Sequence, residues 1–586
     1  MKHGLTKVAL VLAALVAFSG CTFFDADPDS VSNTCSTDSD CVGGVCADIG
    51  GKSACLATGA DIPGLILEVQ PSTEASYGAG TSFLVPFGGY GLKAQSVAGI
   101  VIDRDIVLPH SVVSPIELFI DYDFKGCSLP STRKVPADFI FYRNSMHDGL
   151  PDHEAAAIAL ENETDSYVAD LPQGIYDMLV IPRVPDGCSA APPPPSFHRE
   201  LDVSKGGDVD LHLTTPPHVI SGTVGFPKGQ DLTGWSIQVV EPKRGKPISS
   251  TQALEVEPLN LYASYVLEYF WKGTPDASPV LRLSPPEGVN APRLFWEVAA
   301  LNPLEPNAES IEANLVLVDL DAVGRDVNAF VVDTKGFPVA STVTFRSSEL
   351  SGNASNNANY SIVVDSDHDG RFTTKLLPGK YKVIAHPTFD TTKAVTTDEW
   401  EITTDDDCIC GKAIIIQDKF AISGMVALPD RTPLIWGTAS VYPSRSPERP
   451  YLSSRLATDA SISPIASAPL GSSGDFSLLV DPGLADLLVV PPPGSLFPWL
   501  VHSQLDFQPK DSKEMVDLTS LKLSYPAILR GIVRSPDEAL VTSGAVRAWM
   551  PVAATGFDGT VVIQIGETMT GADGRFTLPL APSFSK

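Results

Sequence analysis

The segment at residues 365–370 holds the residue types that come closest to a metal site in this chain. Its sequence, DSDHDG, places carboxylates at every second position, on Asp365, Asp367 and Asp369, and a glycine at the sixth. Such oxygen ligands suit Ca²⁺, but a complete loop of this kind also needs a bidentate glutamate at its twelfth position. That position is Leu376. Two interpretations stay open: an acidic hairpin turn, which we favour, and a weak single calcium site.

Metal or acid–base chemistry could also use residues 147–154, HDGLPDHE, which hold two histidines and three acids. Gly149 and Pro151 predict a loop, so spacing alone does not place these groups around one ion. The sequence contains no H-E-x-x-H zinc pair, no G-x-S-x-G nucleophile elbow and no phosphate-binding P-loop. We therefore expect a solvated loop here, and no catalytic residue or enzyme activity in the chain.

Seven tryptophans raise the question of sugar binding, because an exposed indole can stack on a pyranose ring. Trp296 and Trp549 lie in apolar runs, which favours packing in a core. Trp235, Trp436 and Trp499 lie next to glycine or proline and could occupy loops, where binding residues concentrate. Carbohydrate binding therefore stays open as an alternative.

The N-terminal sequence, MKHGLTKVALVLAALVAFSGC, predicts export. Lys2, His3 and Lys7 precede an apolar run at residues 8–18, and small residues lead to Cys21, in the order of a secretory signal. The run is shorter than the roughly 20 apolar residues that span a bilayer. Its end resembles the bacterial lipoprotein signal, although Phe18 stands where leucine is usual. The resemblance implies cleavage before Cys21 and acylation of this cysteine; ordinary secretion is the alternative.

Four of the other eight cysteines lie close together, at Cys35, Cys41, Cys46 and Cys55. Their spacings do not form paired C-x-x-C zinc motifs, and no histidine lies nearby. We expect two disulfides, with the connectivity open. The segment resembles the short Cys-rich segment that follows the lipid cysteine in many surface lipoproteins of Gram-negative bacteria.

The remaining cysteines are Cys127, Cys188, Cys408 and Cys410. We expect Cys127 and Cys188 to pair within one domain. Cys408 and Cys410 could close a tight ring or bond to distant partners. The aspartates at residues 405–407 would raise the pKa of these thiols, which disfavours a redox function.

Composition limits the class of protein. The 586 residues are 43% hydrophobic and 19% charged, which is typical of globular domains, and they include 50 prolines and 46 glycines. That many breakers favour short strands over long helices. A net charge of −29 argues against binding to nucleic acid or to anionic lipid headgroups, both of which need basic residues.

After the Cys-rich segment the chain shows a loose repeat. Most units open with a glycine inside an apolar strand, followed later by a turn, a strand, a Pro-Gly corner and another strand. The openings are AGIVID at Gly99, SGTVGF at Gly222, NAFVVD near Phe330, SGMVAL at Gly424 and RGIVRS at Gly531.

The unit near Phe330 shows the pattern best. In GRFTTKL, Phe372 and Leu376 fall on one face and charged residues on the other, as in a half-buried antiparallel strand. The Asp-Gly pair before it and the Leu-Pro-Gly after it suit tight turns. In KYKVIAH, Tyr381 and Val383 again share one face. We expect a hairpin with one apolar face, which a second sheet must cover.

The order G-x-V, P-x-x-x-A, D-x-x-G-x-F-x-L, P-G-x-Y-x-V resembles the carboxypeptidase-regulatory-like, or transthyretin-like, family. The best match runs through Val332, residues 338–340, residues 369–372 and residues 378–381. The resemblance implies seven-stranded sandwich modules that brace, space or bind and carry no chemistry. The H-x-x-E of the zinc carboxypeptidases that accompany this family is absent at all ten histidines.

We predict an all-β chain of tandem antiparallel β-sandwich modules, Ig-like or prealbumin-like, after a small disulfide-rich segment. The expected divisions are a signal peptide at 1–20, a lipidated Cys-rich segment at 21–60, and modules at 61–215, 216–321, 322–418, 419–524 and 525–586. The second module diverges most from the pattern. The fifth stops after its RFTLPL strand, so we expect an unpaired edge, which a truncated sequence explains better than a strand from another chain.

The expected function is that of a non-enzymatic lipoprotein of the cell envelope, with a stalk of β-sandwich modules that presents a binding face. Thr22 after Cys21, instead of aspartate, favours the outer membrane under the sorting rule of bacterial lipoproteins. The bilayer is the expected partner, no cofactor is expected apart from the weak calcium site, and no nucleic acid is bound. The alternative is a carbohydrate- or peptide-binding accessory of an adhesive or degradative surface system.

Overall fold

The computed structural model confirms an all-β protein. The short helices α2 (Val298–Leu301) and η2 (Asp38–Asp40) are the helical elements of the described part, in which no helix has the length and apolar character to cross a membrane. The structure describes residues 33–582 except 50, 59–63, 76, 79–80, 88–99, 109–110, 121–136, 144–152, 159–166, 173, 184–193, 203–208, 214–216, 226–232, 243–244, 257–261, 273–277, 287–292, 302–309, 317–322, 351–358, 406–407, 445–465, 508–515 and 554–559.

The third module shows the architecture most clearly, as seven strands in two facing sheets. Numbered along the chain, its strands have the order 4-1-7 in one sheet and 3-2-5-6 in the other. Strand 7 runs parallel to strand 1, and the other neighbours are antiparallel. The strands are β23 (Arg325–Asp333), β24 (Ser341–Leu350), β25 (Asn359–Asp365), β26 (Arg371–Leu376), β27 (Gly379–Pro387), β28 (Thr396–Ile402) and β29 (Cys408–Ile416).

Alternating apolar residues of both sheets fill the space between them. Phe372 on β26 and Tyr381 on β27 are buried on either side of Phe345, whose ring centroid lies 6.0 and 6.5 Å from theirs. The expected hairpin of these two strands is wrong, because β26 pairs with β23 and β27 pairs with β24 and β28. The corner at residues 377–378 instead carries the chain from one sheet to the other, so that both apolar faces meet in one core.

The first, second and fourth modules repeat this strand order, including the divergent second module. The first has β7 (Ser111–Ile120), β8 (Ala137–Arg143), β9 (His153–Ile158), β10 (Tyr167–Pro172), β11 (Ile175–Pro182), β12 (Ser196–Asp202) and β13 (Val209–Leu213). The second has β14 (His218–Gly225), β15 (Ser236–Val240), β16 (Gln252–Ala253), β17 (Glu255–Val256), β18 (Tyr262–Lys272), β19 (Val280–Ser284), β20 (Arg293–Glu297), β21 (Ser310–Glu312) and β22 (Leu315–Val316), where β17 is an addition to β18 and β22 continues the seventh strand. The fourth has β30 (Phe420–Ala427), β31 (Thr438–Pro443), β32 (Ala466–Pro469), β33 (Asp475–Val480), β34 (Gly483–Val490), β35 (Leu500–Phe507) and β36 (Val516–Lys522).

The fifth module is built from two parts of the chain that are far apart in the sequence. Its strands 1 to 4 are β37 (Ala527–Arg534), β38 (Ala545–Ala553), β39 (Thr560–Met569) and β40 (Arg575–Leu580). Its strands 5 to 7 come from the N-terminal part, as β3 (Leu65–Gln70), β4 (Phe83–Phe87) and β5 (Val101–Asp103), the last continued by β6 (Ile106–Val107). The sheets have the orders β39-β38-β3-β4 and β40-β37-β5, which reproduce the order in the other modules.

Three sequence predictions are corrected by this arrangement. The fifth module has seven strands and the expected open edge is paired, because residues 65–107 supply its strands 5 to 7. The first module begins at β7 rather than at residue 61. The AGIVID segment therefore leads into the closing strand of the fifth module and does not open the first.

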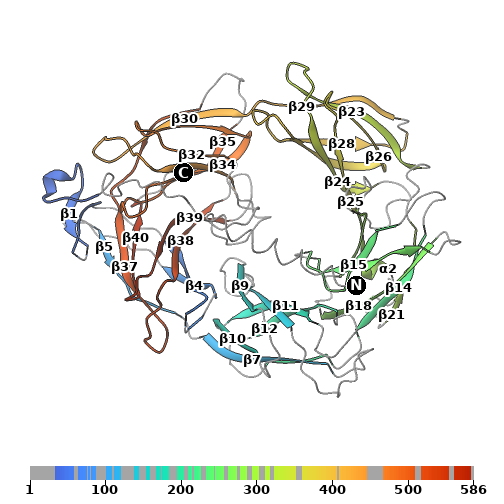
Figure 1. The fold of residues 1–586 in the computed structure, drawn as a ribbon, viewed down its shortest axis with the longest axis horizontal. Helices are drawn as coiled ribbons and strands as arrows, with labels where there is room; N and C mark the ends of the chain where they lie inside the picture. Colours follow the sequence, from blue (N-terminus) through green and yellow to red (C-terminus); the bar gives the residue numbers. More distant parts are fainter. Residues whose placement is uncertain are drawn as a thin grey trace, which may run out of the picture.

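The chain closes into a ring of five modules instead of an extended stalk (Figure 1). The 4-1-7 sheets lie toward the outside and the 3-2-5-6 sheets toward the middle (Figure 1). Strand pairing continues across two module boundaries: β12 runs parallel to β18, and β20 runs antiparallel to β25. The ring order follows the chain, and β6 of the fifth module precedes β7 of the first directly.

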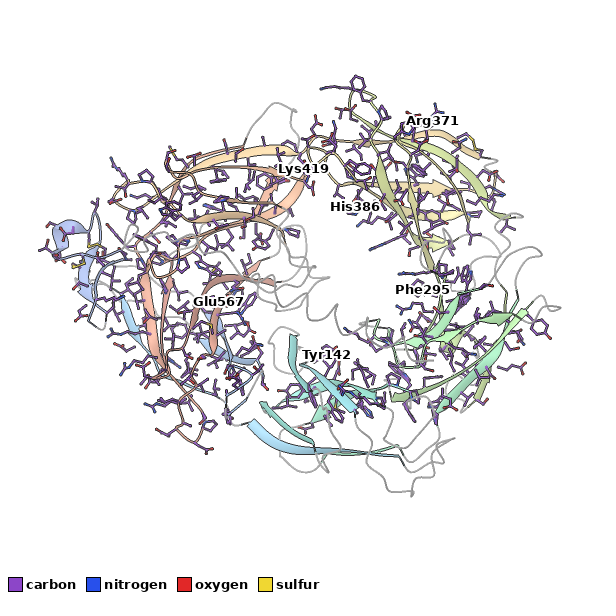
Figure 2. All side chains as sticks on the ribbon, in the orientation of Figure 1. Tyr142, Phe295, Arg371, His386, Lys419 and Glu567 are labelled. Carbon is purple, nitrogen blue, oxygen red and sulfur yellow. A yellow bond between two sulfur atoms is a disulfide. The ribbon has the colours of Figure 1, made fainter. Side chains whose placement is uncertain are left out.

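The boundary between the third and fourth modules is held by an ion-pair cluster. Lys393 Nζ lies 3.0 Å from Asp333 Oδ2 and 2.5 Å from Asp418 Oδ1, next to Lys419, which Figure 2 labels at this boundary. The pKa of Lys393 is raised, mainly by its hydrogen bond to Asp418. The charged amine therefore ties strand β23 to the segment that leads into β30.

In the second and fifth modules, strand 1 contains a glycine because strand 7 passes very close to it. A Cβ on Gly222 would lie 2.0 Å from the carbonyl oxygen of Ala313, at the irregularity between β21 and β22. A Cβ on Gly531 would lie 2.0 Å from the carbonyl oxygen of Arg104, between β5 and β6. Strand 7 thus approaches strand 1 too closely for a side chain, as expected of a glycine within a strand.

Candidate functional site: the seam of the ring

The ring closes at the pairs β3–β38 and β5–β37, which we call the seam. In the antiparallel pair, Leu67 lies opposite Ala548 and Val69 opposite Val546, and all four are buried in the core. In the parallel pair, Ile102 lies opposite Leu529. Apolar alternation on both partners therefore fixes the register of strands that are more than 400 residues apart.

The opposite face of the β3–β38 sheet carries a buried polar network around Glu68. Trp549 Nε1 donates to Glu68 Oε2 at 2.9 Å, and Ser82 Oγ donates to Glu68 Oε1 at 2.8 Å. Arg547 lies between two glutamates: its Nη1 is 3.5 Å from Glu68 Oε1, and its Nε is 3.2 Å from Glu567 Oε1. Figure 2 labels Glu567 on this sheet. Trp549 is fully buried, as its apolar run predicts. Removing one member of such a network would leave a buried charge without its partner.

A second charge pair lies at the parallel half of the seam. Arg530 Nε donates to Asp103 Oδ1 at 2.5 Å and Arg530 Nη2 to Asp103 Oδ2 at 3.2 Å. The hydrogen bonds from Arg530 hold the pKa of Asp103 below its usual value. Asp105 Oδ1 also accepts a hydrogen bond from the backbone N–H of Ile532 at 2.9 Å. These contacts join the two ends of the chain outside the core.

The Cys-rich segment forms a small disulfide knot. Cys35 pairs with Cys46 and Cys41 with Cys55, around the hairpin of β1 (Val45–Asp48) and β2 (Ser53–Leu56). Within the described residues, the sulfurs of Cys35, Cys41 and Cys55 are the one group of three ligand atoms within 4.8 Å of one another. Because all three sulfurs are in disulfides, this group is a crosslink rather than a zinc site.

The knot docks across the seam. Val42 N donates to the hydroxyl of Tyr525 at 3.0 Å, and Ala57 N donates to the carbonyl of Pro526 at 3.0 Å, just before β37. Leu56 of the knot is in a buried cluster with Ile528 of β37, against which Val101 of β5 packs. The knot therefore contacts both halves of the fifth module where they meet.

The aspartates at 365–370 form a turn shared by three modules. Gly370 adopts a φ of 71°, its N–H donates to Asp367 O, and Asp367 N donates to Arg371 O at 2.8 Å. The turns at residues 471–475 and 571–575 have the same hydrogen bonds without the carboxylate series. Asp365 Oδ1 accepts a hydrogen bond from Thr342 at 2.6 Å. The fold thus explains the turn without a metal, and the calcium site stays a prediction.

The other sequence candidates do not meet at one place. Cys408 and Cys410 form a disulfide with each other on β29, an edge strand. Cys21, Cys127 and Cys188 lie outside the described residues, as does most of the segment at 147–154, of which the structure describes backbone on β9.

The loop tryptophans divide into two groups. Trp235 and Trp499 are buried, at 2% and 9% exposure, and Trp296 is buried at 7%. Trp436 is 55% exposed, and its φ is 63°. A bulky side chain in the left-handed region is an outlier, so this position combines strain with exposure.

The seam was missed by sequence reasoning, although a signal was present. The last unit lacks the Pro-Gly corner and strand that follow RFTTKL and DFSLLV. A Pro-Gly corner followed by a strand does occur just after the knot, as Pro63 and Gly64 followed by LILEVQ, which is β3. Matching the missing half of the last unit to the surplus half of the first would have predicted closure.

The fold and the seam define a tandem β-sandwich protein closed into a ring. No family model matches its sequence, and no match was found among curated proteins. Among solved structures it is similar to a streptococcal ancillary pilin (TM-score 0.23, 11% identity, covering 52% of this chain and 99% of that chain). It is also similar to the TIE protein of Bacillus anthracis (0.16, 11%, 70% and 73%) and a minor pilin of Streptococcus agalactiae (0.20, 11%, 34% and 96%).

Proposed function

We propose that this protein is a non-enzymatic lipoprotein of the cell envelope and that its ring of sandwich modules is a rigid structural platform. The observation that supports it best is the closure of the fifth module by residues 65–107, because the pairing of these strands with β37 and β38 joins distant parts of the chain into one continuous scaffold. The seven-strand order also supports assignment of the modules to the carboxypeptidase-regulatory-like family, whose modules are accessory.

The anchor in this proposal is the acylated Cys21. Cys35, the first cysteine of the knot, lies fourteen positions after it, and a fully extended chain of that length spans at most about 50 Å. Since the knot docks on the fifth module, the ring would be held close to the bilayer. Several acyl chains on one cysteine suffice for stable anchoring. Thr22 favours the outer membrane as the destination.

Replacing the lipid-bearing cysteine tests this proposal. In Cys21→Ser we expect the protein to leave the membrane fraction and to lose the mass of the acyl groups, while the knot and the ring stay folded. Mass spectrometry of the N-terminal peptide and fractionation of membranes measure both results. Wild-type protein that carries no lipid on Cys21 would contradict the anchor, and Cys35→Ser/Cys46→Ser is the control for loss of a cysteine without loss of the anchor.

The second candidate function is carbohydrate binding, which the exposed and strained Trp436 favours. The equivalent position before the second strand is Gly234 in the second module and Ser543 in the fifth, which also have positive φ. A bulky aromatic where glycine or serine fits better is the kind of local strain that functional positions retain.

The test compares Trp436→Ala with Trp499→Phe, a change at a buried tryptophan, on a glycan array and on purified cell-wall polysaccharide. A sugar-stacking function predicts that Trp436→Ala abolishes retention and that the control keeps it. Equal retention of the wild-type protein and Trp436→Ala would contradict this candidate.

A further inference from the structure

The fifth module is the one module whose described strands come from two distant parts of the chain. In the third and fourth modules, strands 4 and 5 are joined by corners of a few residues, at 377–378 and 481–482. In the fifth module, strand 4 ends at Leu580 and strand 5 begins at Leu65. No short corner joins the halves, so the seam, its polar contacts and the knot hold them together.

An opened ring would have two complementary surfaces. One is the half module at residues 527–580, which would lack partners for one edge of β38 and one edge of β37 and would expose the core residues Val546 and Ala548. The other is the segment at 65–107, whose Leu67 and Val69 fill that core in the closed ring. Each surface on one copy fits the other surface on a second copy, with the same pairs and the same register.

We propose that the seam is a strand-exchange site whose partner is a second copy of this chain. In the exchanged form, residues 65–107 of one copy complete the fifth module of the next. Exchange of an identical element between copies is a route to oligomers that needs no new interface. Mutual exchange closes a dimer, and one-way exchange continues from copy to copy.

Two features of the molecule favour the second copy as partner. The closing segment ends with β6, before β7 opens the first module, so its exchange would take no strand away from that module. Attachment of copies to one membrane, which rests on the proposed anchor, would raise their local concentration, the quantity that decides between exchange within a chain and between chains. The exchange itself does not depend on the lipid.

Variants of the full-length chain with one added cysteine distinguish exchange from closure. Gln70 on β3 lies opposite Ala545 on β38, and opposite residues of an antiparallel pair are within reach of a disulfide or a short thiol crosslinker. Gln70→Cys and Ala545→Cys chains with different tags are coexpressed, purified in detergent and oxidised. Exchange predicts a crosslinked species that carries both tags and has twice the mass of one chain.

Three controls make the result decisive. The double variant Gln70→Cys/Ala545→Cys must crosslink within one chain, which shows that both positions fold and react. The same double variant, oxidised before it is mixed with wild-type chains, must form no species that combines the two kinds of chain, because its seam is locked. Thr342→Cys and His386→Cys, opposite residues of β24 and β27 in the contiguous third module, must give no species with both tags. If the double variant crosslinks internally and the coexpressed single variants also yield no such species, the proposal is overturned, whether or not Cys21 carries a lipid.

Discussion

A chain that begins at Ser111 and ends at residue 582 is expected to lose the fold of its fifth module while the third and fourth modules stay folded. It lacks three of the seven strands of that module and the buried Leu67, Val69 and Phe83. Burying one such side chain stabilises a fold by about 1.5–3 kcal/mol, and a domain as a whole is stable by about 5–15 kcal/mol. The loss therefore exceeds what the module can tolerate.

Hydrogen exchange of the peptides from β37 to β40 measures this result. We expect complete exchange within the shortest labelling time in the shortened chain and strong protection in the intact protein, because protection follows the free energy of local opening. The third module provides the internal reference in the same sample. Protection of β37 and β38 in the shortened chain would show that the half module folds alone.

A circular permutant is the matched control. It begins at Ser111 and carries residues 61–108 after residue 582, so that Pro63 and Gly64 restore the corner that joins strands 4 and 5 in the third module. It lacks the knot, as the shortened chain does, and differs from it by the closing strands. We expect its fifth module to regain protection from exchange, which would assign the loss to those strands.

The second large effect is expected from Gly531→Ala. The new Cβ would lie 2.0 Å from Arg104 O and 2.5 Å from the carbonyl carbon of Arg104, and both atoms are backbone. Strand β37 and the segment between β5 and β6 would have to separate, and overpacking of this kind costs about 1–3 kcal/mol. We expect the seam to open about 5 to 150 times more often, measured as faster hydrogen exchange in β5, β6 and β37.

The control for this prediction is Gly222→Ala, which makes the same close contact with Ala313 O inside the second module. Faster exchange there should be confined to β14, β21 and β22. In the third module the glycine is on the opposite strand: Ala329 lies on β23 and Gly411, with a φ of 76°, on β29. Unchanged hydrogen exchange in β5, β6 and β37 of Gly531→Ala would contradict the prediction. It would mean that strand 7 of the fifth module can shift to accept an alanine on strand 1, as strand 7 does in the third module.

The strands themselves were predictable where the pattern is local. Alternation in RFTTKL and KYKVIAH placed Phe372 and Tyr381 in the core, and the Asp-Gly pair placed a positive φ at Gly370. Alternation does not say which strand is the neighbour, and this is why the hairpin of β26 and β27 was wrong. Both strands turn apolar faces to the same core, but from different sheets.

The candidate site was not predictable from any local pattern. Its contacts join Asp103 to Arg530 and Glu68 to Trp549, and the sequence separation of these pairs exceeds 400 residues. Tyr525 likewise reads as an ordinary linker residue until the knot is placed against its hydroxyl. The second module shows the reverse case. Its YASYVLEYFWK segment departs from the family pattern, yet it forms β18 because Ala263, Tyr265 and Leu267 alternate toward the core.

The position of the knot determines how tension would travel through the molecule if Cys21 is tethered. A pull on the tether enters at the two disulfides, which do not extend, and passes to the β1–β2 hairpin and then to β3. Because β3 is hydrogen-bonded on both edges, to β38 and β4, the load is shared by several bonds at once along that strand. The strands that close the ring are thus also the strands that would receive the force from the tether.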